Sequence, residues 1–454
     1  MDIEKCKVSG EGEWQLWVVI ACLKHFNQHS PLTTRRMINI MKNKKIYPWV
    51  VVMLLWGVAL LNYMDRQMLA TMKPAMMTTF AELESAANFG RLMAIFLWIY
   101  AFMSPVSGLI ADRINRKWLI TGSLFVWSAV TMLMGFCTEF NQLYILRGIM
   151  GISEAFYMPA GLAVIADYHE GKTRSLAIGI HMTGIYLGQA FGGFGAIFAT
   201  NFSWETTFHI FGFIGIAYSL ILIFFLKEKR GDQDEKHAGQ TFFREVGSAL
   251  KGMGTLLKTI TFWVILFYFA APSFPGWAAK NWLPTLISTS LDINMDYAGP
   301  IATITLSLSS LIGVLGGGII SDRWVQRNLR GRIYTGVIGL GLTIPSLLLI
   351  GLGGNIVPVI IGAIGFGFGF GMFDVNNMPI LCQFASPRHR ATGYGLMNLV
   401  GISSGAFITN FLGGSADSGT LGRDFAILGL VVLAAIILVL TVLKPKYVNK
   451  VHPG

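Results

Sequence analysis

The stretch GLIADRINRK (108–117) recurs as GIISDRWVQR (318–327), 210 residues further along the chain. Each copy lies between two long apolar runs and has a glycine, an Asp-Arg pair four residues later, and further basic residues. A weaker sequence similarity relates TRSLAIG (173–179) to HRATGYG (389–395) at an offset of 216. Recurrence at a nearly constant offset indicates two related structural units. We therefore predict two halves of similar topology.

The composition indicates that both halves lie in a membrane. Only 13% of the 454 residues are charged and 53% are hydrophobic, whereas soluble domains average about 25% charged residues. A helix crosses the hydrocarbon core with about 20 mostly apolar residues. Twelve such runs lie near 47–72, 88–111, 118–137, 142–167, 173–199, 208–227, 261–287, 297–321, 332–352, 355–384, 391–413 and 424–443. We predict an all-α polytopic membrane protein with twelve transmembrane helices in two pseudo-symmetric six-helix halves.

The basic residues predict the orientation of these helices. Of the 35 Lys and Arg residues, 29 fall on one side if the N-terminus is cytoplasmic, which is the side that the positive-inside rule predicts. We therefore expect a cell (inner) membrane protein with both termini in the cytoplasm. Because this asymmetry explains the net charge of +11, we expect no nucleic-acid partner. The four scattered cysteines have no metal-ligand spacing, and we expect neither a metal nor a cofactor.

The polar stretch after the sixth run divides the chain into five predicted segments. KEKRGDQDEKHAGQ is followed by TFFREVGSALKGMGTLLK, which has the pattern of a basic amphipathic helix on a membrane surface. The predicted segments are a cytoplasmic N-terminal segment (1–46), an N-terminal six-helix bundle (47–227), a cytoplasmic linker with the amphipathic helix (228–260), a C-terminal six-helix bundle (261–444) and a cytoplasmic tail (445–454).

Five charged residues inside the predicted spans are the main candidates for function. They are Asp65, Arg66, Arg147, Glu154 and Asp374. A charge at the bilayer centre costs at least about 2.5–3.5 kcal/mol on insertion scales. Arg147 and Glu154, seven residues apart, project from one helical stripe at depths that differ by about 10 Å. We expect Asp65 to pair with Arg147 across two helices.

Two interpretations of these charges are open. Fixed ion pairs would only hold the N-terminal half together. Alternatively, the carboxylate of a solute competes for an arginine, whose planar fork suits a carboxylate. The carboxylate released from that arginine then favours protonation in an apolar site, so that proton and anion occupy the cavity together.

Other polar residues on the spans are candidates for the wall of a binding cavity. FDVNNMP (373–379) places Asp374 and Asn377 on one face before a proline kink. PSFPGW (272–277) and NWLP (281–284) predict a broken seventh helix. The remaining candidate residues for solute binding are Tyr63, Tyr100, His181, Tyr186, Gln189 and Asn398.

The repeated loop resembles the signature of the major facilitator superfamily. RGIMGISEA (147–155) and GIYLGQAFGG (184–193) resemble its fourth-helix and fifth-helix patterns, the latter without the usual proline. This resemblance covers roughly residues 45–445 and implies that the repeated loop latches an inner gate. The gate residues it implies are Gly108, Asp112, Arg113, Gly318, Asp322 and Arg323. The alternative is that the basic residues of the loop only set topology.

Within that superfamily, NYMDR (62–66) and RGIMGISEA resemble the anion:cation symporter family. The resemblance implies that Asp65 and Glu154 couple protons and that Arg66 and Arg147 contact an anion. Ile185 stands where that family often has a glutamine, and Asp374 lies outside the pattern. The same motifs also resemble the spinster-like branch, which handles lysolipids and sphingoid lipids.

We therefore expect a secondary active transporter that imports a small carboxylated solute together with protons by alternating access. A sugar acid, such as a hexonate or a hexuronate, is the expected solute, and a lysolipid is the alternative. We expect a monomer in the lipid bilayer. An enzyme is not expected because the chain has no Ser/His/Asp array, HExxH or nucleotide-binding loop. A channel or a sensor that does not transport fits less well, because the gating loop is repeated and the carboxylates are retained.

Overall fold

The computed structural model describes residues 46–111, 113–169, 173–227, 242–386 and 389–443. The predicted N-terminal segment before residue 46, the first part of the predicted linker (228–241), the predicted C-terminal tail and Asp112 lie outside these residues. The chain divides into two units after Val51. The second unit contains every contact discussed below.

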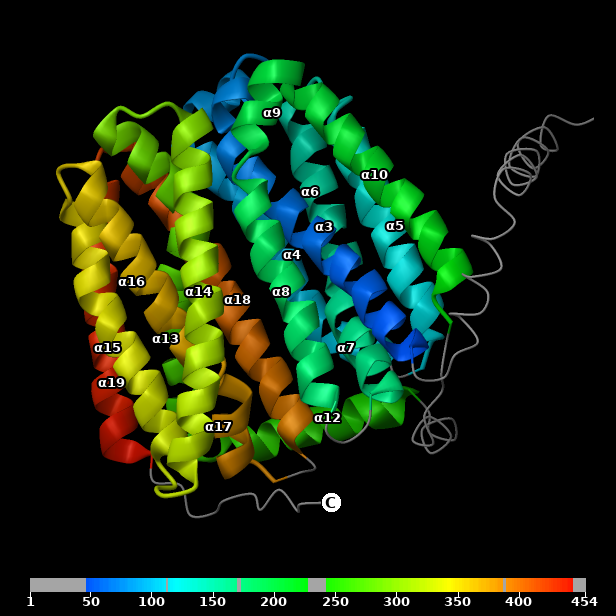
Figure 1. Ribbon diagram of the computed structural model, residues 1–454, viewed down its shortest axis with the longest axis vertical. Coiled ribbons are helices and arrows are strands. Elements are labelled where there is room, and N and C mark those ends of the chain that lie inside the picture. The colour runs from blue at the N-terminus through cyan, green and yellow to red at the C-terminus, as the bar shows by residue number, and fades with distance from the viewer. Residues whose placement is uncertain (1–45, 112, 170–172, 228–241, 387–388, 444–454) are drawn as a thin grey trace, which may run out of the picture. The chain divides into compact units, whose positions relative to one another are not determined.

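Every regular element in the described residues is a helix, as predicted (Figure 1). The first bundle consists of α3 (Tyr47–Met76), the short 3-10 helix η1 (Ala81–Glu84), α4 (Ala86–Ala111), α5 (Arg116–Met134), α6 (Phe140–Ala155), α7 (Tyr157–Tyr168), α8 (Arg174–Gly192), α9 (Gly195–Phe202) and α10 (Trp204–Phe225). The second consists of α13 (Ile260–Leu291), α14 (Met295–Val325), α15 (Gly331–Leu352), α16 (Ile356–Asp374), α17 (Asn377–Phe384), α18 (Arg390–Asp417) and α19 (Leu421–Val442). Helix α12 (Phe242–Leu257) lies between them in the sequence.

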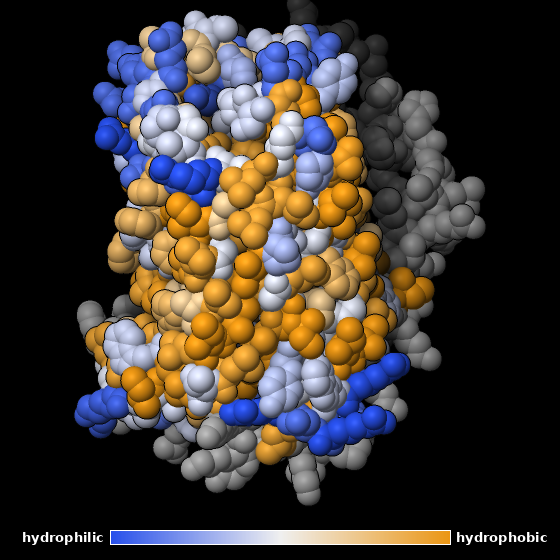
Figure 2. Space-filling model, turned by 90° about the vertical axis from the view of Figure 1, so that its left-hand side faces the viewer, coloured by the Kyte–Doolittle hydropathy of each residue, from blue (hydrophilic) through white to orange (hydrophobic). Residues whose placement is uncertain are grey.

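Eleven spans within the described residues are long and apolar enough to cross a membrane. The other predicted span, 173–199, corresponds to α8 and α9. Helix α8 is less apolar than the others because it carries His181, Thr183 and Gln189, and it packs against α14 of the second bundle. On the face shown in Figure 2, a hydrophobic belt separates two polar ends, as expected for a protein that spans a bilayer.

Two of the spans are interrupted at corresponding places in the repeat. The fourth span breaks at Phe156, between α6 and α7, and the tenth breaks between α16 and α17. Pro159 and Pro379 are each the third residue after the break. A proline is tolerated in the first turn of a helix but disrupts its interior, so each proline favours a new helix start. The kink predicted at Pro379 is confirmed by the break between α16 and α17.

The prediction of a broken seventh helix is wrong, because α13 is continuous over 32 residues. It contains Pro272, Pro275 and Pro284. A proline has no N–H for the carbonyl four residues earlier, so Pro284 frees the carbonyl of Lys280. The Nε2 of Gln67 donates a hydrogen bond to this oxygen at 2.8 Å. A polar side chain from α3 thus satisfies the carbonyl, and the helix does not need to break.

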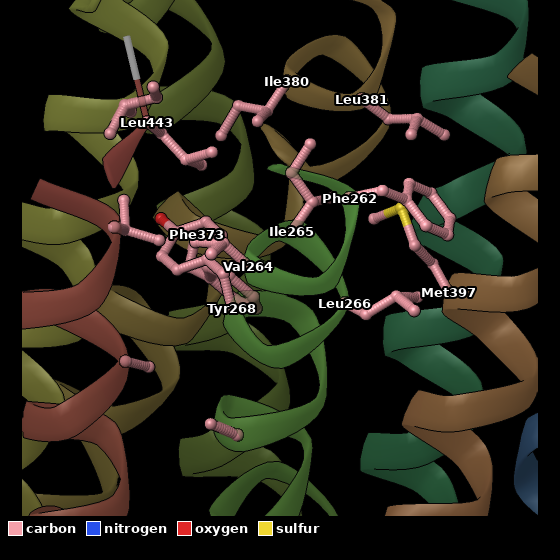
Figure 3. Close-up of a cluster of buried hydrophobic side chains, with 14 of the residues drawn as sticks. Phe262, Val264, Ile265, Leu266, Tyr268, Phe373, Ile380, Leu381, Met397 and Leu443 are labelled. Atoms are coloured by element: carbon pink, nitrogen blue, oxygen red, sulfur yellow. The ribbon is translucent and has the colours of Figure 1, made fainter. Parts of the chain in front are cut away.

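A hydrophobic cluster fixes the end of the second bundle near α12. Figure 3 shows Phe262 and Ile265 of α13 together with Ile380, Leu381 and Met397 from α17 and α18. Leu256 of α12 joins this cluster, while Lys251 and Lys258 of the same region are exposed. The helix therefore presents an apolar side to the bundle and basic residues to the outside, which matches its predicted amphipathic pattern.

We call the end of the molecule that contains α9 the α9 end, and the opposite end the α12 end (Figure 1). Among the described residues, the hydrogen bonds that join the two bundles lie toward the α9 end. The Oδ1 of Asp417, at the end of α18, accepts from the backbone N–H of Ala86 at 2.6 Å, and its Oδ2 accepts from that of Ala87 at 2.9 Å. Asp417 thus caps the N-terminus of α4 across the bundle boundary.

Glycines allow the backbones to meet at the same end. A Cβ on Gly413 of α18 would lie 2.6 Å from the carbonyl oxygen of Ala86 in α4. A Cβ on Gly193 would lie 1.9 Å from Thr303 Oγ1 of α14. Both distances are too short for any residue with a side chain, so these two glycines are required for the closed α9 end.

We predict that Asp417→Asn loosens the α9 end. The change removes charge from bonds to two backbone N–H groups, and bonds to charged groups contribute about 1.5–3 kcal/mol each. Spin labels at Asn201 and Asp292, exposed at this end of the two bundles, should report a larger population with a long separation. Glu84→Gln removes a nearby exposed carboxylate without such bonds and should leave the distance distribution unchanged. An unchanged distribution in Asp417→Asn would contradict the capping role.

Candidate functional site

An ion pair inside the first bundle is the centre of the site. Arg66 Nε of α3 donates to Glu154 Oε2 of α6 at 2.5 Å, and the side chain of Glu154 is 0% exposed. The Arg66 guanidinium carbon lies 4.7–4.8 Å from the ring centres of Tyr63, Phe96 and Tyr100. Three aromatic faces and one carboxylate therefore hold the planar guanidinium in a fixed orientation.

Arg147 lies beside this pair but has different contacts. Its guanidinium carbon is 4.7 Å from the centre of the Phe96 ring, and its Nη1 is 3.1 Å from Met150 Sδ. Asp65 and Arg147 are both buried and lie within electrostatic range of each other. The predicted ion pair between them is not formed: within the described part of the chain, no acidic oxygen lies within 4.0 Å of Arg147. The prediction is wrong because Glu154 binds Arg66, and Arg147 packs on Phe96 and Met150.

Several polar atoms in this centre have no hydrogen-bond partner among the described residues. They are Asp65 Oδ1, Glu154 Oε1, Arg66 Nη2 and Arg147 Nε. Buried polar groups are normally paired, and an unpaired one carries a desolvation cost. Two donors from arginines and two acceptors from carboxylates thus remain able to bind an anion or a proton.

A second acidic residue, Asp374, lies at the end of α16 in the second bundle. Its Oδ1 accepts from Asn377 Nδ2 at 3.1 Å, which confirms that the two residues share a face. Lys280 of α13 lies within electrostatic range of Asp374 and also of Arg66. The Lys280 ammonium is 5.1 Å from the centre of the Trp277 indole ring.

The surroundings of Asp374 come from both bundles. Tyr63 of α3, Tyr186 of α8 and Tyr394 of α18 lie within electrostatic range of its carboxylate. Tyr394 in turn hydrogen-bonds Asn398 and lies near Tyr100. Asp374 is nevertheless exposed. A side chain that is exposed while helices of both bundles surround it must border space between them that water can enter.

A narrow crevice, too small to hold a water molecule, lies at the boundary between the bundles. Gln67 of α3, Gln189 of α8, Lys280 of α13, and Thr303 and Ser307 of α14 line it together with four apolar residues. Gln189 therefore faces the bundle boundary, whereas Tyr186, on the same helix, is near Asp374. Polar side chains from both bundles therefore meet at this boundary.

His181 is the one predicted solute-binding residue that the structure separates from this group. It is fully buried in the first bundle, with its ring 6.0 Å from that of Tyr157. Tyr157 donates its hydroxyl hydrogen to the Leu55 carbonyl at 2.6 Å. Leu55 lies about three turns along α3 from Arg66 toward the α12 end, so His181 belongs to the packing around that part of α3.

The predicted gate residues that the structure describes, all except Asp112, lie at the α12 end. Asp322 Oδ1 accepts from Arg332 Nη2 at 2.7 Å within the second bundle, whereas Arg113 and Arg323 are exposed. No described atom lies within 4 Å of a Cβ built on Gly108, and for Gly318 the nearest is Val375 Cγ2 at 3.7 Å. Neither glycine therefore lies at a close contact between helices in this structure.

Sequence reasoning missed Lys280 and Tyr394. Lys280 follows Arg66 by 214 residues, and Asp374 follows Glu154 by 220, offsets close to those of the repeated motifs. Each acid also precedes a proline, Pro159 or Pro379, by five residues. This second repeat in the sequence could have identified Lys280 as a candidate site residue. Tyr394 had no comparable signal, because tyrosines are common at many positions of membrane helices.

The family profile described as Major Facilitator Superfamily matches residues 55–410. The chain belongs to the Major Facilitator Superfamily. This superfamily consists of transporters rather than enzymes, as expected from the sequence, and the helical fold with its related halves is the one predicted. The described residues contain no group of three or more His, Cys, Asp or Glu side chains that could hold a metal ion.

The chain is similar to members of the superfamily that have different names. Protein spinster homolog 1 of Xenopus laevis is 28% identical over 316 residues, which are 66% of this chain and 59% of that protein. The hexuronate transporter of Escherichia coli K12 is 25% identical over 433 residues, 89% of this chain and 96% of that one. A bacterial homologue of the human lysosomal transporter Spinster, crystallised in an inward-facing and occupied conformation, has a TM-score of 0.68 at 20% identity, covering 86% of this chain and 96% of that one.

We predict that Glu154→Leu destabilises the transporter by about 3–5 kcal/mol, because it leaves the Arg66 charge buried without its carboxylate. The double variant Arg66→Met/Glu154→Leu should regain most of this loss. Thermal unfolding of the purified variants measures both effects. Asp322→Ala breaks a pair in which the carboxylate is 64% exposed and should cost less than about 1 kcal/mol. Equal losses in Glu154→Leu and Asp322→Ala would contradict a buried, coupled pair.

Proposed function

We propose that this transporter carries a small carboxylated solute, a sugar acid such as a hexonate or a hexuronate, together with protons. The observation that carries the proposal is the Arg66 guanidinium, which is oriented by three rings and one carboxylate while its Nη2 has no partner among the described residues. Similarity to the hexuronate transporter over 89% of the chain supports the same class of solute.

The proposed coupling is a competition for Arg66. A solute carboxylate binds the guanidinium fork through two N–H groups and displaces Glu154. A carboxylate that loses its cation in an apolar site favours the neutral form, so Glu154 takes a proton, and Asp65 is the second proton-coupling carboxylate. Arg147 provides a further N–H for the anion. One proton moved with one monovalent anion is electroneutral, so import is driven by the proton concentration difference.

The hydroxyl groups of the solute are proposed to lie toward the second bundle. Asp374 accepts hydrogen bonds from them, and Asn377, Asn398, Tyr63, Tyr100, Tyr186 and Gln189 contribute further polar contacts. These residues supply both donors and acceptors, which a polyhydroxylated solute requires. His181, buried away from this group, is left out of the proposed binding site.

Alternating access is proposed to proceed by rocking of the two bundles. The hydrogen bonds at the α9 end join the bundles, and the predicted orientation makes the α12 end cytoplasmic, so this state gives access from the cytoplasm. In the opposite state, we propose that the loops containing Asp112, Arg113, Asp322 and Arg323 join the bundles at the α12 end, with Gly108 and Gly318 allowing the helices to approach.

A lysolipid or a similar lipid-like solute is the second candidate. Similarity to a spinster homologue, at 28% identity, favours it. A lipid must enter sideways between helices, and the helices proposed for this are α3, α4 and α18. Helices α4 and α18 pack together, with a Cβ on Gly90 only 2.9 Å from the Thr409 carbonyl oxygen. This contact closes that lateral route near the α9 end, which favours the small solute.

We predict that purified protein in liposomes accumulates D-glucuronate or D-gluconate when a proton gradient is imposed and releases it when the gradient is dissipated. Glu154→Gln should lose gradient-driven accumulation but retain counterflow exchange, because the amide cannot carry a proton although it can still hydrogen-bond. Uptake of labelled solute measures both activities. Accumulation that persists in Glu154→Gln would make Glu154 structural.

Two outcomes of the same assay distinguish the candidates. Uptake of a sugar acid that is independent of the gradient would contradict proton coupling but leave the solute class intact. Transfer of a labelled lysophospholipid, with no uptake of either sugar acid, would replace the first candidate by the second. Empty liposomes, and liposomes with D-glucose as solute, control for leakage and for recognition without a carboxylate.

A further inference from the structure

The two bundles contain corresponding pairs of a basic and an acidic residue. In the first bundle, Arg66 is on the first helix and Glu154 on the fourth; in the second bundle, Lys280 and Asp374 occupy the first and fourth helices of that half. Each acid lies at the end of a helix segment, just before the break that separates it from Pro159 or Pro379. The repeat therefore places a cation and a carboxylate at matching positions on either side of the bundle boundary.

The two pairs differ in their contacts. Arg66 binds Glu154 directly at 2.5 Å. Within the described residues, no acidic oxygen lies within 4.0 Å of Lys280 Nζ. The Lys280 ammonium lies 5.1 Å from the centre of the Trp277 ring and 5.9 Å from that of Phe370. Lys280 is half-buried, and aromatic faces compensate the lost hydration of such a cation only partly, so Lys280 retains the capacity to bind an anion.

The backbone brings this ammonium close to the proposed anion site. Gln67, which follows Arg66 on α3, donates to the carbonyl of Lys280 at 2.8 Å. The turns that carry Arg66 and Lys280 therefore face each other across the bundle boundary, and the two cations lie within electrostatic range. Lys280 also lines the crevice with Gln67 and Gln189. Two like charges held this close repel each other, and an anion between them removes that repulsion.

We infer that Lys280 is a second anion contact, so that a single carboxylate of the solute is held between Arg66 of the first bundle and Lys280 of the second. This inference rests on the proposed function and adds a residue to its binding site. The solute is then a monocarboxylate whose hydroxylated remainder extends toward Asp374. Because its carboxylate binds both bundles, the bound anion itself helps to hold them in the arrangement that encloses it.

The experiment measures the dissociation constant of D-glucuronate for purified protein and for Lys280→Met. We expect at least tenfold weaker binding in Lys280→Met and a change of less than about threefold in Lys280→Arg, which keeps the charge. Only the backbone carbonyl of Lys280 accepts from Gln67, so this contact between the bundles is retained in every variant. Lys280→Gln replaces Lys280→Met if thermal unfolding shows that the methionine variant is not folded.

Two further variants separate contact with the anion from charge balance. Lys117→Met is the matched control, because Lys117 also lies over an indole ring, at 5.4 Å from Trp118, but in the first bundle at the α12 end; its binding constant should not change. Lys280→Met/Asp374→Asn keeps the net charge of the second pair at zero. Because Asp374 is itself a proposed solute contact, this double variant is compared with Asp374→Asn alone. Weaker binding in the double variant than in Asp374→Asn supports direct contact, whereas equal binding in the two would overturn it and make Lys280 a neutraliser of Asp374.

The remaining outcomes distinguish this inference from the proposed function. Unchanged binding in Lys280→Met, together with lost binding in Arg66→Met, would overturn the role of Lys280 and leave the proposed function standing. If neither D-glucuronate nor D-gluconate binds the wild-type protein, the proposed function itself fails, and the role of Lys280 fails with it.

Discussion

The ion pair between Arg66 and Glu154 is the constraint around which the first bundle is organised. Two charges taken out of water are costly unless each finds a partner and further hydrogen bonds. Glu154 is fully buried, and the Arg66 side chain is 11% exposed, so neither can rely on water. The surrounding rings of Tyr63, Phe96 and Tyr100 add partial compensation. The guanidinium and the carboxylate are therefore stable in this site only together, and an anion that replaces the carboxylate must leave the charge of the site balanced.

The contacts between the bundles are of a different kind, because they can be exchanged for water at little cost. Pro284 leaves the Lys280 carbonyl without its helical donor, and Gln67 supplies one from the other bundle. Asp417 caps α4 in the same way, by binding backbone N–H groups that a helix always leaves unpaired. When the bundles separate, water can satisfy the same groups. The buried ion pair stays within one bundle, so it does not oppose the motion.

The sequence predicts the fold better than it predicts the contacts of the site. Hydropathy and the repeated loop motif were sufficient for the spans and the two halves, because burial in lipid depends on composition over about 20 residues. The pairing of Asp65 with Arg147 was wrong because depth and helical face do not determine which of two neighbouring arginines a carboxylate reaches. The continuous α13 was missed because the donor for the carbonyl freed by Pro284 is more than 200 residues away, at Gln67.

The repeat explains both why Lys280 was overlooked and why it matters. Duplication preserves the position of a charge more readily than its contacts: the cation of the first bundle binds its own acid, whereas that of the second lies over Trp277 and Phe370. In a site with two identical ion pairs, a solute would have to displace a carboxylate before it could bind either cation. Here the ion pair of the first bundle is formed and that of the second is not. The first therefore provides a carboxylate that can be released, and the second provides a cation that has no carboxylate bound to it. In the proposed mechanism, the departure from symmetry at this position, rather than the symmetry itself, gives the two bundles different roles in binding the anion.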